Sequence, residues 1–150
     1  MNLSASIKHF VSLKNIAVIG VSSSGKGIGF SVYQHLKDND YKVYPINKNG
    51  GTIDAETLYK SINDIKAQID GVVTVVPPDE TEKVVSEISD LGIKYIWMQQ
   101  GSESKNAIEF CNKNDIQVVY GECILMFAEP VTSFHRFHRG ISKLFGKYPR

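Results

Sequence analysis

Ile16-Ala-Val-Ile-Gly-Val21 leads directly into Gly20-Val-Ser-Ser-Ser-Gly-Lys-Gly-Ile-Gly29, and this stretch decides the fold. The apolar, β-branched run predicts a strand, and Ile28, Val32 and Leu36 continue at the i, i+4 spacing of a helix. A glycine-rich loop that leaves a strand and opens a helix can bring backbone N–H groups close to a phosphate. This stretch therefore predicts a strand–loop–helix unit with an anion-binding loop.

Four further apolar runs of strand length follow, at Tyr41–Asn47, Gly71–Val76, Lys94–Gln99 and Ile116–Tyr120. Helical patterns separate or precede the runs: a leading helix over Leu3–Leu13, a short one around Glu56–Ile65, one over Asp79–Leu91 opened by an acidic capping box of Asp79 and Glu82, and one over Ala107–Asn114. Strands that alternate with helices predict an α/β fold, a Rossmann-like doubly wound parallel sheet of five strands. Right-handed crossovers favour the strand order 3-2-1-4-5.

Length and composition indicate one globular domain. The chain has 150 residues, of which 42% are hydrophobic and 22% charged. No apolar run approaches the roughly 20 residues of a membrane span, and the first residues lack the apolar segment of a signal peptide. Two cysteines are too few for a disulfide framework, so we expect the reducing cytoplasm. A net charge of +1 argues against nucleic-acid binding.

The charge is unevenly distributed, which divides the chain into a body, residues 1–129, and a basic amphipathic tail, residues 130–150. After Glu129 there are five basic residues and no acidic one. Apolar residues in the tail recur at helical spacing, at Phe134, Phe137, Ile141 and Leu144. Membrane-surface or nucleic-acid binding is one reading of such a helix. We favour docking of its aromatic face on the body or on a second subunit; in the second case the tail would form a homo-oligomer.

The loop after the first strand supplies most of the candidate phosphate ligands. Serine hydroxyls and the Lys26 ammonium would add to the backbone donors, giving the set Gly20, Ser22, Ser23, Ser24, Gly25, Lys26, Gly27 and Gly29. The loop nearly matches the P-loop pattern, but Gly27 replaces the Ser or Thr that holds magnesium, which argues against nucleotide hydrolysis. The spacing from Gly20 also fails the G-x-G-x-x-G pattern.

The end of the second strand bears on which nucleotide is bound. An NAD site uses an acidic residue there to bind the ribose hydroxyls, whereas this strand ends Asn47-Lys48. A cation at this place suits a phosphorylated ribose, which means NADP or the 3′-phosphate of coenzyme A (CoA).

At this point the residues resemble a known family. The chain looks like the small stand-alone CoA-binding proteins in five places: Ala17–Ser22, Tyr41–Asn47, Leu58–Ile65, Trp97–Gly101 and Cys123. That family is related to the CoA-binding domain of the succinyl-CoA synthetase α-subunit. The resemblance covers about Asn15 to Phe127.

The resemblance implies a non-covalent site for CoA or an acyl-CoA, with the pyrophosphate on the loop Gly20–Gly29. Asn47 and Lys48 would lie near the adenosine end. Val76, Pro77 and Pro78 would flank the adenine or pantetheine, with Gln99, Gln100, Gly101 and Cys123 further along the crevice. Lys48 stands where the family often has Pro, and Gln100 where it often has Leu. The phosphohistidine domain of the synthetase has no counterpart, so ligase activity is not implied.

Two other features could carry chemistry. Cys123 is either a redox-active thiol beside the CoA thiol or a small residue in a tight loop, and we favour the second reading. His135 and His138 are three residues apart but have no third ligand, so no metal is predicted. The sequence thus favours a CoA-binding module over an enzyme. An NADP-dependent oxidoreductase that uses the same loop, or an interaction protein with a decayed nucleotide site, remain as alternatives.

Overall fold

The computed structural model describes residues 2–128, and a five-stranded parallel sheet lies at its centre. The strands are β1 (Asn15–Ile19), β2 (Lys42–Ile46), β5 (Gly71–Thr74), β6 (Tyr95–Met98) and β7 (Gln117–Tyr120). The Rossmann-like α/β fold is confirmed. The tail 130–150, with its predicted docking and oligomer contact, lies outside the described residues.

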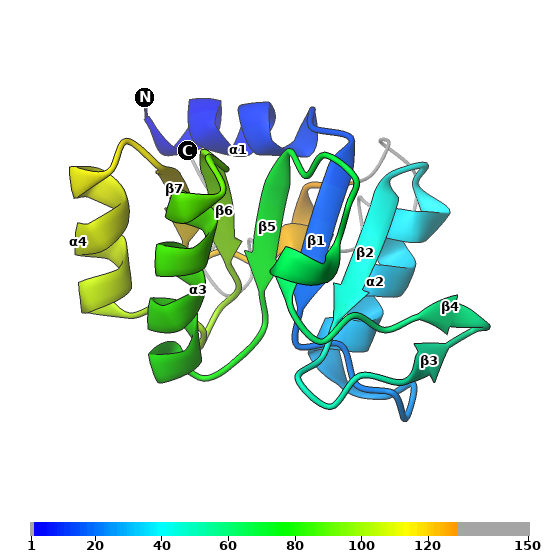
Figure 1. The fold of residues 1–150 in the computed structure, drawn as a ribbon. Helices are drawn as coiled ribbons and strands as arrows, with labels where there is room; N and C mark the ends of the chain where they lie inside the picture. The colour runs from blue at the N-terminus through cyan, green and yellow to red at the C-terminus, as the bar shows by residue number, and fades with distance from the viewer. Residues whose placement is uncertain (1, 129–150) are drawn as a thin grey trace.

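Helices cover both faces of the sheet (Figure 1). In that view α3 and α4 lie in front with the short 3₁₀ turn η1, while α2 and the 3₁₀ turn η2 lie behind, and α1 crosses the amino ends of the strands. The bounds are α1 Leu3–Val11, α2 Gly27–Asp38, η1 Ile62–Asp64, α3 Pro78–Asp90, α4 Lys105–Lys113 and η2 Ile124–Met126. Because both faces are covered, β5 is buried at every position and two separate apolar cores form.

The predicted strand order is wrong. The observed order is β2-β1-β5-β6-β7. If these five strands are numbered 1 to 5 along the chain, their order across the sheet is 2-1-3-4-5, with the third strand inside the sheet and the second at its edge. Right-handed crossovers fix the hand of each connection but not the side on which the third strand lands. Pro45 within β2 is the missed signal, because proline has no N–H for a neighbour and is confined to edge strands.

The helix predicted around Glu56–Ile65 is also wrong. This segment holds β4 (Glu56–Thr57), which pairs antiparallel with β3 (Thr52–Ile53), and then the single turn η1. Leu58 and Ile62 have helical spacing, yet Leu58 packs in the core behind the sheet and Ile62 in the core in front. One helix cannot bury its apolar stripe on two faces. The chain instead wraps around the edge strand β2.

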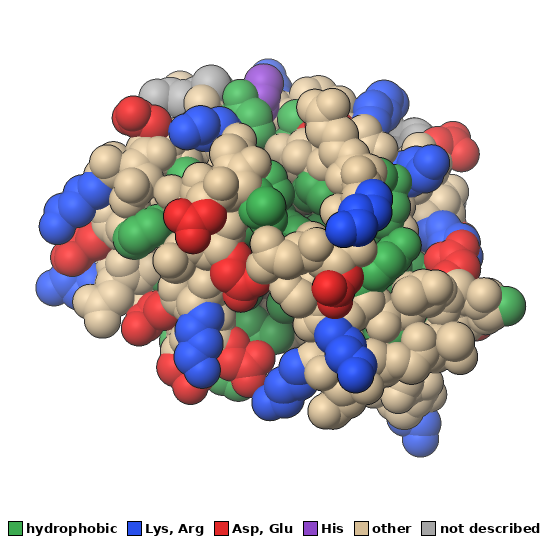
Figure 2. Space-filling view, in the orientation of Figure 1, with side chains coloured by type: hydrophobic (Ala, Val, Ile, Leu, Met, Phe, Trp, Pro, Cys, Tyr) green, Lys and Arg blue, Asp and Glu red, His purple; other side chains and the backbone are tan. Residues whose placement is uncertain are grey.

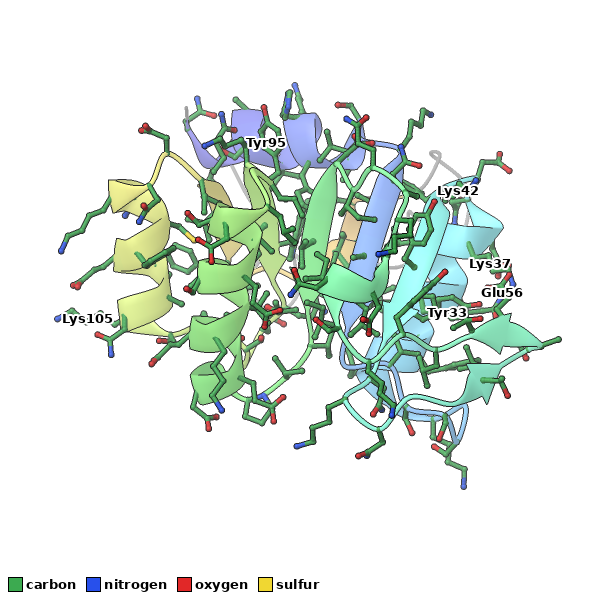
Figure 3. The ribbon with its side chains drawn as sticks, viewed as in Figure 1. Tyr33, Lys37, Lys42, Glu56, Tyr95 and Lys105 are labelled. Carbon is green, nitrogen blue, oxygen red and sulfur yellow. The ribbon has the colours of Figure 1, made fainter. Side chains whose placement is uncertain are left out.

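An ionic contact fastens the β3–β4 hairpin to α2 (Figure 3). The Tyr33 hydroxyl donates to the Glu56 carboxylate, and Lys37 Nζ lies 2.9 Å from the same group. Hydrogen bonds from Tyr33 and Lys37 lower the pKa of Glu56. The hairpin is therefore held against α2, beside the edge strand β2, and the chain after it passes to the front of the sheet at η1.

Asp70 joins the amino ends of the two central strands. Its Oδ2 accepts hydrogen bonds at 2.9 Å from both the backbone and the side chain of Asn15, and its own N–H donates to Asn15 O at 2.8 Å. Burial acts to raise the pKa of Asp70, but the hydrogen bonds from Asn15 and from the Lys14 backbone outweigh it and lower the pKa. The carboxylate form is therefore the one that links β1 to β5.

Asp70→Asn should lower the free energy of unfolding at pH 7 by about 1 kcal/mol, because it weakens charge-assisted hydrogen bonds at a partly exposed position. A carboxyl whose pKa falls on folding stabilises the protein above its unfolded-state pKa, near 3.9, and loses that effect as pH falls through the folded-state value. Urea titrations should therefore show a difference from wild type at pH 7 that shrinks below about pH 4.

The control is Glu109→Gln, which removes an exposed carboxylate from α4. Equal stability of Asp70→Asn and wild type at pH 7, or a difference that persists unchanged at pH 2.5, would contradict this role for Asp70.

Candidate functional site

A hollow of about 440 Å³ opens at the carboxyl ends of the strands. It lies where the chain reverses its direction across the sheet, between β1, which leads to β2 on one side, and β5 on the other. Ligands of doubly wound sheets bind at this switch point. Lysine and carboxylate side chains gather along the lower rim of the molecule there (Figure 2). The lining includes Ile19, Gly20, Ser22, Ile46, Asn47, Lys48, Asn49, Lys60, Ser61, Ile62, Val76, Glu80, Lys83, Val84 and Glu87.

Two glycines let the loop after β1 pack closely. Gly20 has a φ of +111°, and a Cβ there would lie 2.2 Å from Val75 O. A Cβ on Gly29 would lie 2.0 Å from Gly20 O. The end of β1 therefore touches both the end of β5 and the start of α2, and no larger residue fits at either position.

The rest of the loop forms a turn in front of α2. The Ser24 N–H donates to Ser22 Oγ at 3.2 Å, and the two serine hydroxyls are 2.7 Å apart. Gly25 and Gly27 adopt φ values of +74° and +92°, which favour glycine. Lys26 is the N-cap residue of α2, and within residues 2–128 no side chain caps this helix. The first N–H groups of α2 are thus left for water or an anion.

Only part of the predicted phosphate loop lines the hollow. Gly20 and Ser22 do so, while the other predicted loop residues lie outside the lining: Ser23, Ser24, Gly25, Lys26, Gly27 and Gly29. All of these except Gly29 are exposed. The loop is therefore a rim beside the hollow rather than its floor.

Asn47 organises the loop after β2. Its Nδ2 donates to Val21 O at 2.9 Å, and its Oδ1 accepts from Asn49 N at 2.8 Å. Its backbone N–H donates to Tyr59 O at 2.8 Å. Asn47 lines the hollow as predicted, but its side-chain hydrogen bonds join the ends of β1 and β2.

Three lysines line the hollow, of which the sequence identified one. Lys48 Nζ lies 3.4 Å from Glu80 Oε1, across the mouth. Lys60 and Lys83 were missed, Lys60 because its segment was assigned to a helix. The stem of Lys60 packs on Gly50, where an added Cβ would lie 2.9 Å from Lys60 Cε. Among the lining residues within 2–128, the three ammonium groups outnumber the two carboxylates, Glu80 and Glu87.

The residues predicted further along the crevice form a separate group at the ends of β6 and β7. Gln99 is buried; its Nε2 donates to Cys123 Sγ at 3.0 Å, and its Oε1 accepts from Ile124 N at 2.9 Å. Gln100 Nε2 donates to Gly121 O at 3.0 Å, and Gly101 N donates to Glu103 Oε2 at 3.0 Å. In this structure Gln99 and Gln100 therefore hold the 121–125 loop.

Between the two groups, Val76 lines the hollow, and Pro77 and Pro78 begin α3. The predicted capping box is wrong. Pro77 is the N-cap residue and contributes no side-chain hydrogen bond, while the Glu82 carboxylate accepts from the Ser104 hydroxyl instead. Because Ser104 caps α4, this bond joins the amino ends of α3 and α4.

Buried hydroxyls that the sequence analysis missed complete the edge. Ser102 Oγ lies 2.8 Å from Thr81 Oγ1 and donates to Thr74 Oγ1 at 2.9 Å. All three residues are at most 2% exposed. Scattered serines and threonines carry no spacing signal, so only the fold brings these three together. They fix the loop after β6 against the end of β5.

The two cysteines differ in environment. Cys111 is fully buried on α4, and burial raises the pKa of its thiol to about 12. Cys123 is half-buried at the carboxyl edge, beside Gln99. With so high a pKa, the Cys111 thiol stays protonated at neutral pH and does not react as a nucleophile. Cys123 is therefore the cysteine to test for thiol chemistry.

Among residues 2–128 there is no cluster of three or more His, Cys, Asp and Glu side chains that could hold a metal ion, and His135 and His138 lie outside this range. None of the helices described is long and apolar enough to cross a membrane.

Comparison with known proteins agrees with this geometry. The chain is 26% identical to the α-subunit of an ADP-forming acetate–CoA ligase (II) from Pyrococcus furiosus over 129 residues, 79% of this chain but only 28% of that subunit. It is 26% identical to the uncharacterised protein YneT of Bacillus subtilis, over 74% of this chain and 82% of YneT.

Among solved structures, a conserved hypothetical protein from Pyrococcus furiosus matches 75% of this chain and 97% of its own, with a TM-score of 0.71 and 29% identity. The model of the CoA binding domain matches residues 14–129, which include every strand of the sheet and the whole hollow. The chain therefore belongs to the CoA-binding domain family.

Proposed function

We propose that the protein binds CoA or an acyl-CoA non-covalently at the carboxyl edge of the sheet, without catalysis of its own. The observation that carries the proposal is the hollow at the β1–β5 switch point. Lys48, Lys60 and Lys83 line it, and the loop that opens α2 lies beside it. Membership of the CoA-binding domain family supports CoA as the nucleotide.

The charge distribution supports one orientation of the ligand. The pyrophosphate would lie against the loop Gly20–Gly29, where α2 offers backbone N–H groups and the positive end of its dipole. The adenosine 3′-phosphate would lie in the hollow near Lys48 and Lys60. Lys48 is 78% exposed and already paired with Glu80, so Lys60 would share the role that the sequence analysis predicts for Lys48 alone.

The pantetheine arm would leave the hollow past Val76-Pro77-Pro78 and run toward the ends of β6 and β7. Neighbouring strands are about 4.8 Å apart, so β5 and β7 are separated by roughly 10 Å. An extended arm spans such a distance, and its thiol end would approach Cys123. Because the amides of Gln99 and Gln100 already bond the 121–125 loop, these two residues would support the arm through that loop, with Gly101 beside them.

The carboxylates of the hollow support binding rather than catalysis. Glu80 is paired with Lys48, and Glu87 accepts hydrogen bonds from Ser61 and Asn63. Neither is poised as a free general acid or base. The ligase named in the comparison is a protein of which this chain spans 28%, so its activity is not assigned to this chain.

An NADP-dependent oxidoreductase is the second candidate, because the same lysines would suit a 2′-phosphate on the ribose. An interaction protein with a decayed site is the third. Titration calorimetry with CoA, dephospho-CoA, NAD and NADP separates the three. Our proposal expects CoA to bind most tightly, NADP binding without CoA binding would support the oxidoreductase, and no binding of any ligand would support the decayed site.

The 3′-phosphate should strengthen binding through Lys48 and Lys60. A charge-assisted hydrogen bond contributes ~1.5–3 kcal/mol, and exposure reduces this, so we expect dephospho-CoA to bind several-fold to about tenfold more weakly than CoA. Lys48→Ala and Lys60→Ala should each reduce that difference, and the double variant should remove most of it. Lys26→Ala should weaken both ligands alike, through the pyrophosphate.

Lys105→Ala is the matched control, since Lys105 lies on α4, across the molecule from β2 (Figure 3). It should leave both affinities unchanged. Equal affinities of wild type for CoA and dephospho-CoA would refute the role of the two lysines while leaving the site itself standing.

If the thiol end of the pantetheine arm reaches Cys123, this cysteine should form a mixed disulfide with oxidised CoA selectively. Its thiolate would attack one sulfur of oxidised CoA, which forms the protein–CoA disulfide and releases the other half as CoA thiol. Intact-mass measurement should show a single CoA adduct that reductant removes and that Cys123→Ser abolishes. Cys111, with its raised pKa, should stay unmodified in peptide maps.

Oxidised glutathione at the same concentration controls for simple exposure of the thiol, and it should react more slowly than oxidised CoA. Modification of both cysteines to the same extent, or of neither, would instead support Cys123 as a packing residue.

A further inference from the structure

We propose that Glu80 sets how strongly the site prefers a 3′-phosphorylated ligand, by competing with that phosphate for Lys48. The inference rests on the proposed function. It concerns a carboxylate that the sequence analysis did not identify and that stands inside a site for an anionic ligand.

Glu80 and Lys48 face each other across the mouth of the hollow. Glu80 lies in the first turn of α3, which follows β5, and Lys48 lies in the loop after β2. Lys48 Nζ and Glu80 Oε1 are 3.4 Å apart, and the side chains are 78% and 35% exposed. A phosphate that reaches Lys48 must therefore displace the less exposed Glu80 carboxylate or accept it as a like-charged neighbour.

The other charges of the hollow are arranged differently. Within residues 2–128, Lys60 and Lys83 have no carboxylate at ion-pair distance. Glu87 is bonded by Asn63 Nδ2 at 3.1 Å and Ser61 Oγ at 3.4 Å, so it ties η1 to α3 and holds no lysine. Glu80 is thus the carboxylate whose removal would free a cation at the mouth.

Glu80 stands at the positive end of a helix dipole. The positive end of the α3 dipole stabilises carboxylates in the first turn, where Asp79 and Glu80 both lie. The competition acts on the 3′-phosphate rather than on the pyrophosphate, which would lie at α2.

The test measures the ratio of the dissociation constants of dephospho-CoA and CoA by calorimetry. Exposed ion pairs are weak, so Glu80→Gln should raise this ratio by about two- to fivefold, mainly by tightening CoA. In the Lys48→Ala background the same substitution should leave the ratio unchanged, because the lysine that Glu80 pairs with is absent. Glu87→Gln removes one charge from the same wall of the hollow, and it should change the ratio less than Glu80→Gln.

Three outcomes would overturn the inference. If wild type binds both ligands but Glu80→Gln leaves the ratio unchanged, the site stands and the role of Glu80 falls. If Glu80→Gln acts equally with and without Lys48, or if Glu87→Gln acts as strongly, the effect is general repulsion rather than competition for Lys48. If wild type binds neither ligand, the proposed function and this inference fail together.

Discussion

The close approach of Gly29 to Gly20 is the contact on which the candidate site depends. With no side chain on either residue, the start of α2 rests on the carbonyl of Gly20, and Gly20 rests on the carbonyl of Val75. Three backbone segments therefore meet at one point: the ends of β1 and β5 and the first turn of α2. This contact places the first turn of α2 beside the end of β1, at the carboxyl edge of the sheet.

The path of the chain between β2 and β5 builds the other half of the site. Tyr33 and Lys37 hold the β3–β4 hairpin against α2, beside the edge strand β2, and the chain then passes that strand to place η1 in front of the sheet. This detour brings Lys60 and Ser61 to face Glu80 and Glu87 of α3. A plain helical crossover would have left the hollow without that wall.

The sequence predicted much of this architecture, for reasons that individual residues make clear. Ile16–Val21 was recognisable as a strand because both of its faces are apolar, and Ile28, Val32 and Leu36 marked α2. Pro45 marks β2 as an edge strand, a signal that the predicted strand order overlooked. Lys60 could not have been placed, because Leu58 and Ile62 have the spacing of one helical stripe while packing on opposite faces of the sheet.

Gln99 was assigned to the ligand, but its amide is hydrogen-bonded to Cys123 and Ile124. Spacing along the sequence does not reveal such contacts.

The central claim is that the loop after β1 holds the pyrophosphate of a CoA molecule and the hollow beside it holds the 3′-phosphate of the same molecule. A crystal structure of the protein soaked with CoA tests it most directly. The account predicts the pyrophosphate at the first turn of α2 and the adenosine 3′-phosphate within reach of Lys60 at the β1–β5 switch point. CoA bound elsewhere, for example along the outer edge of β2, or bound with its adenosine outside the hollow, would contradict the account.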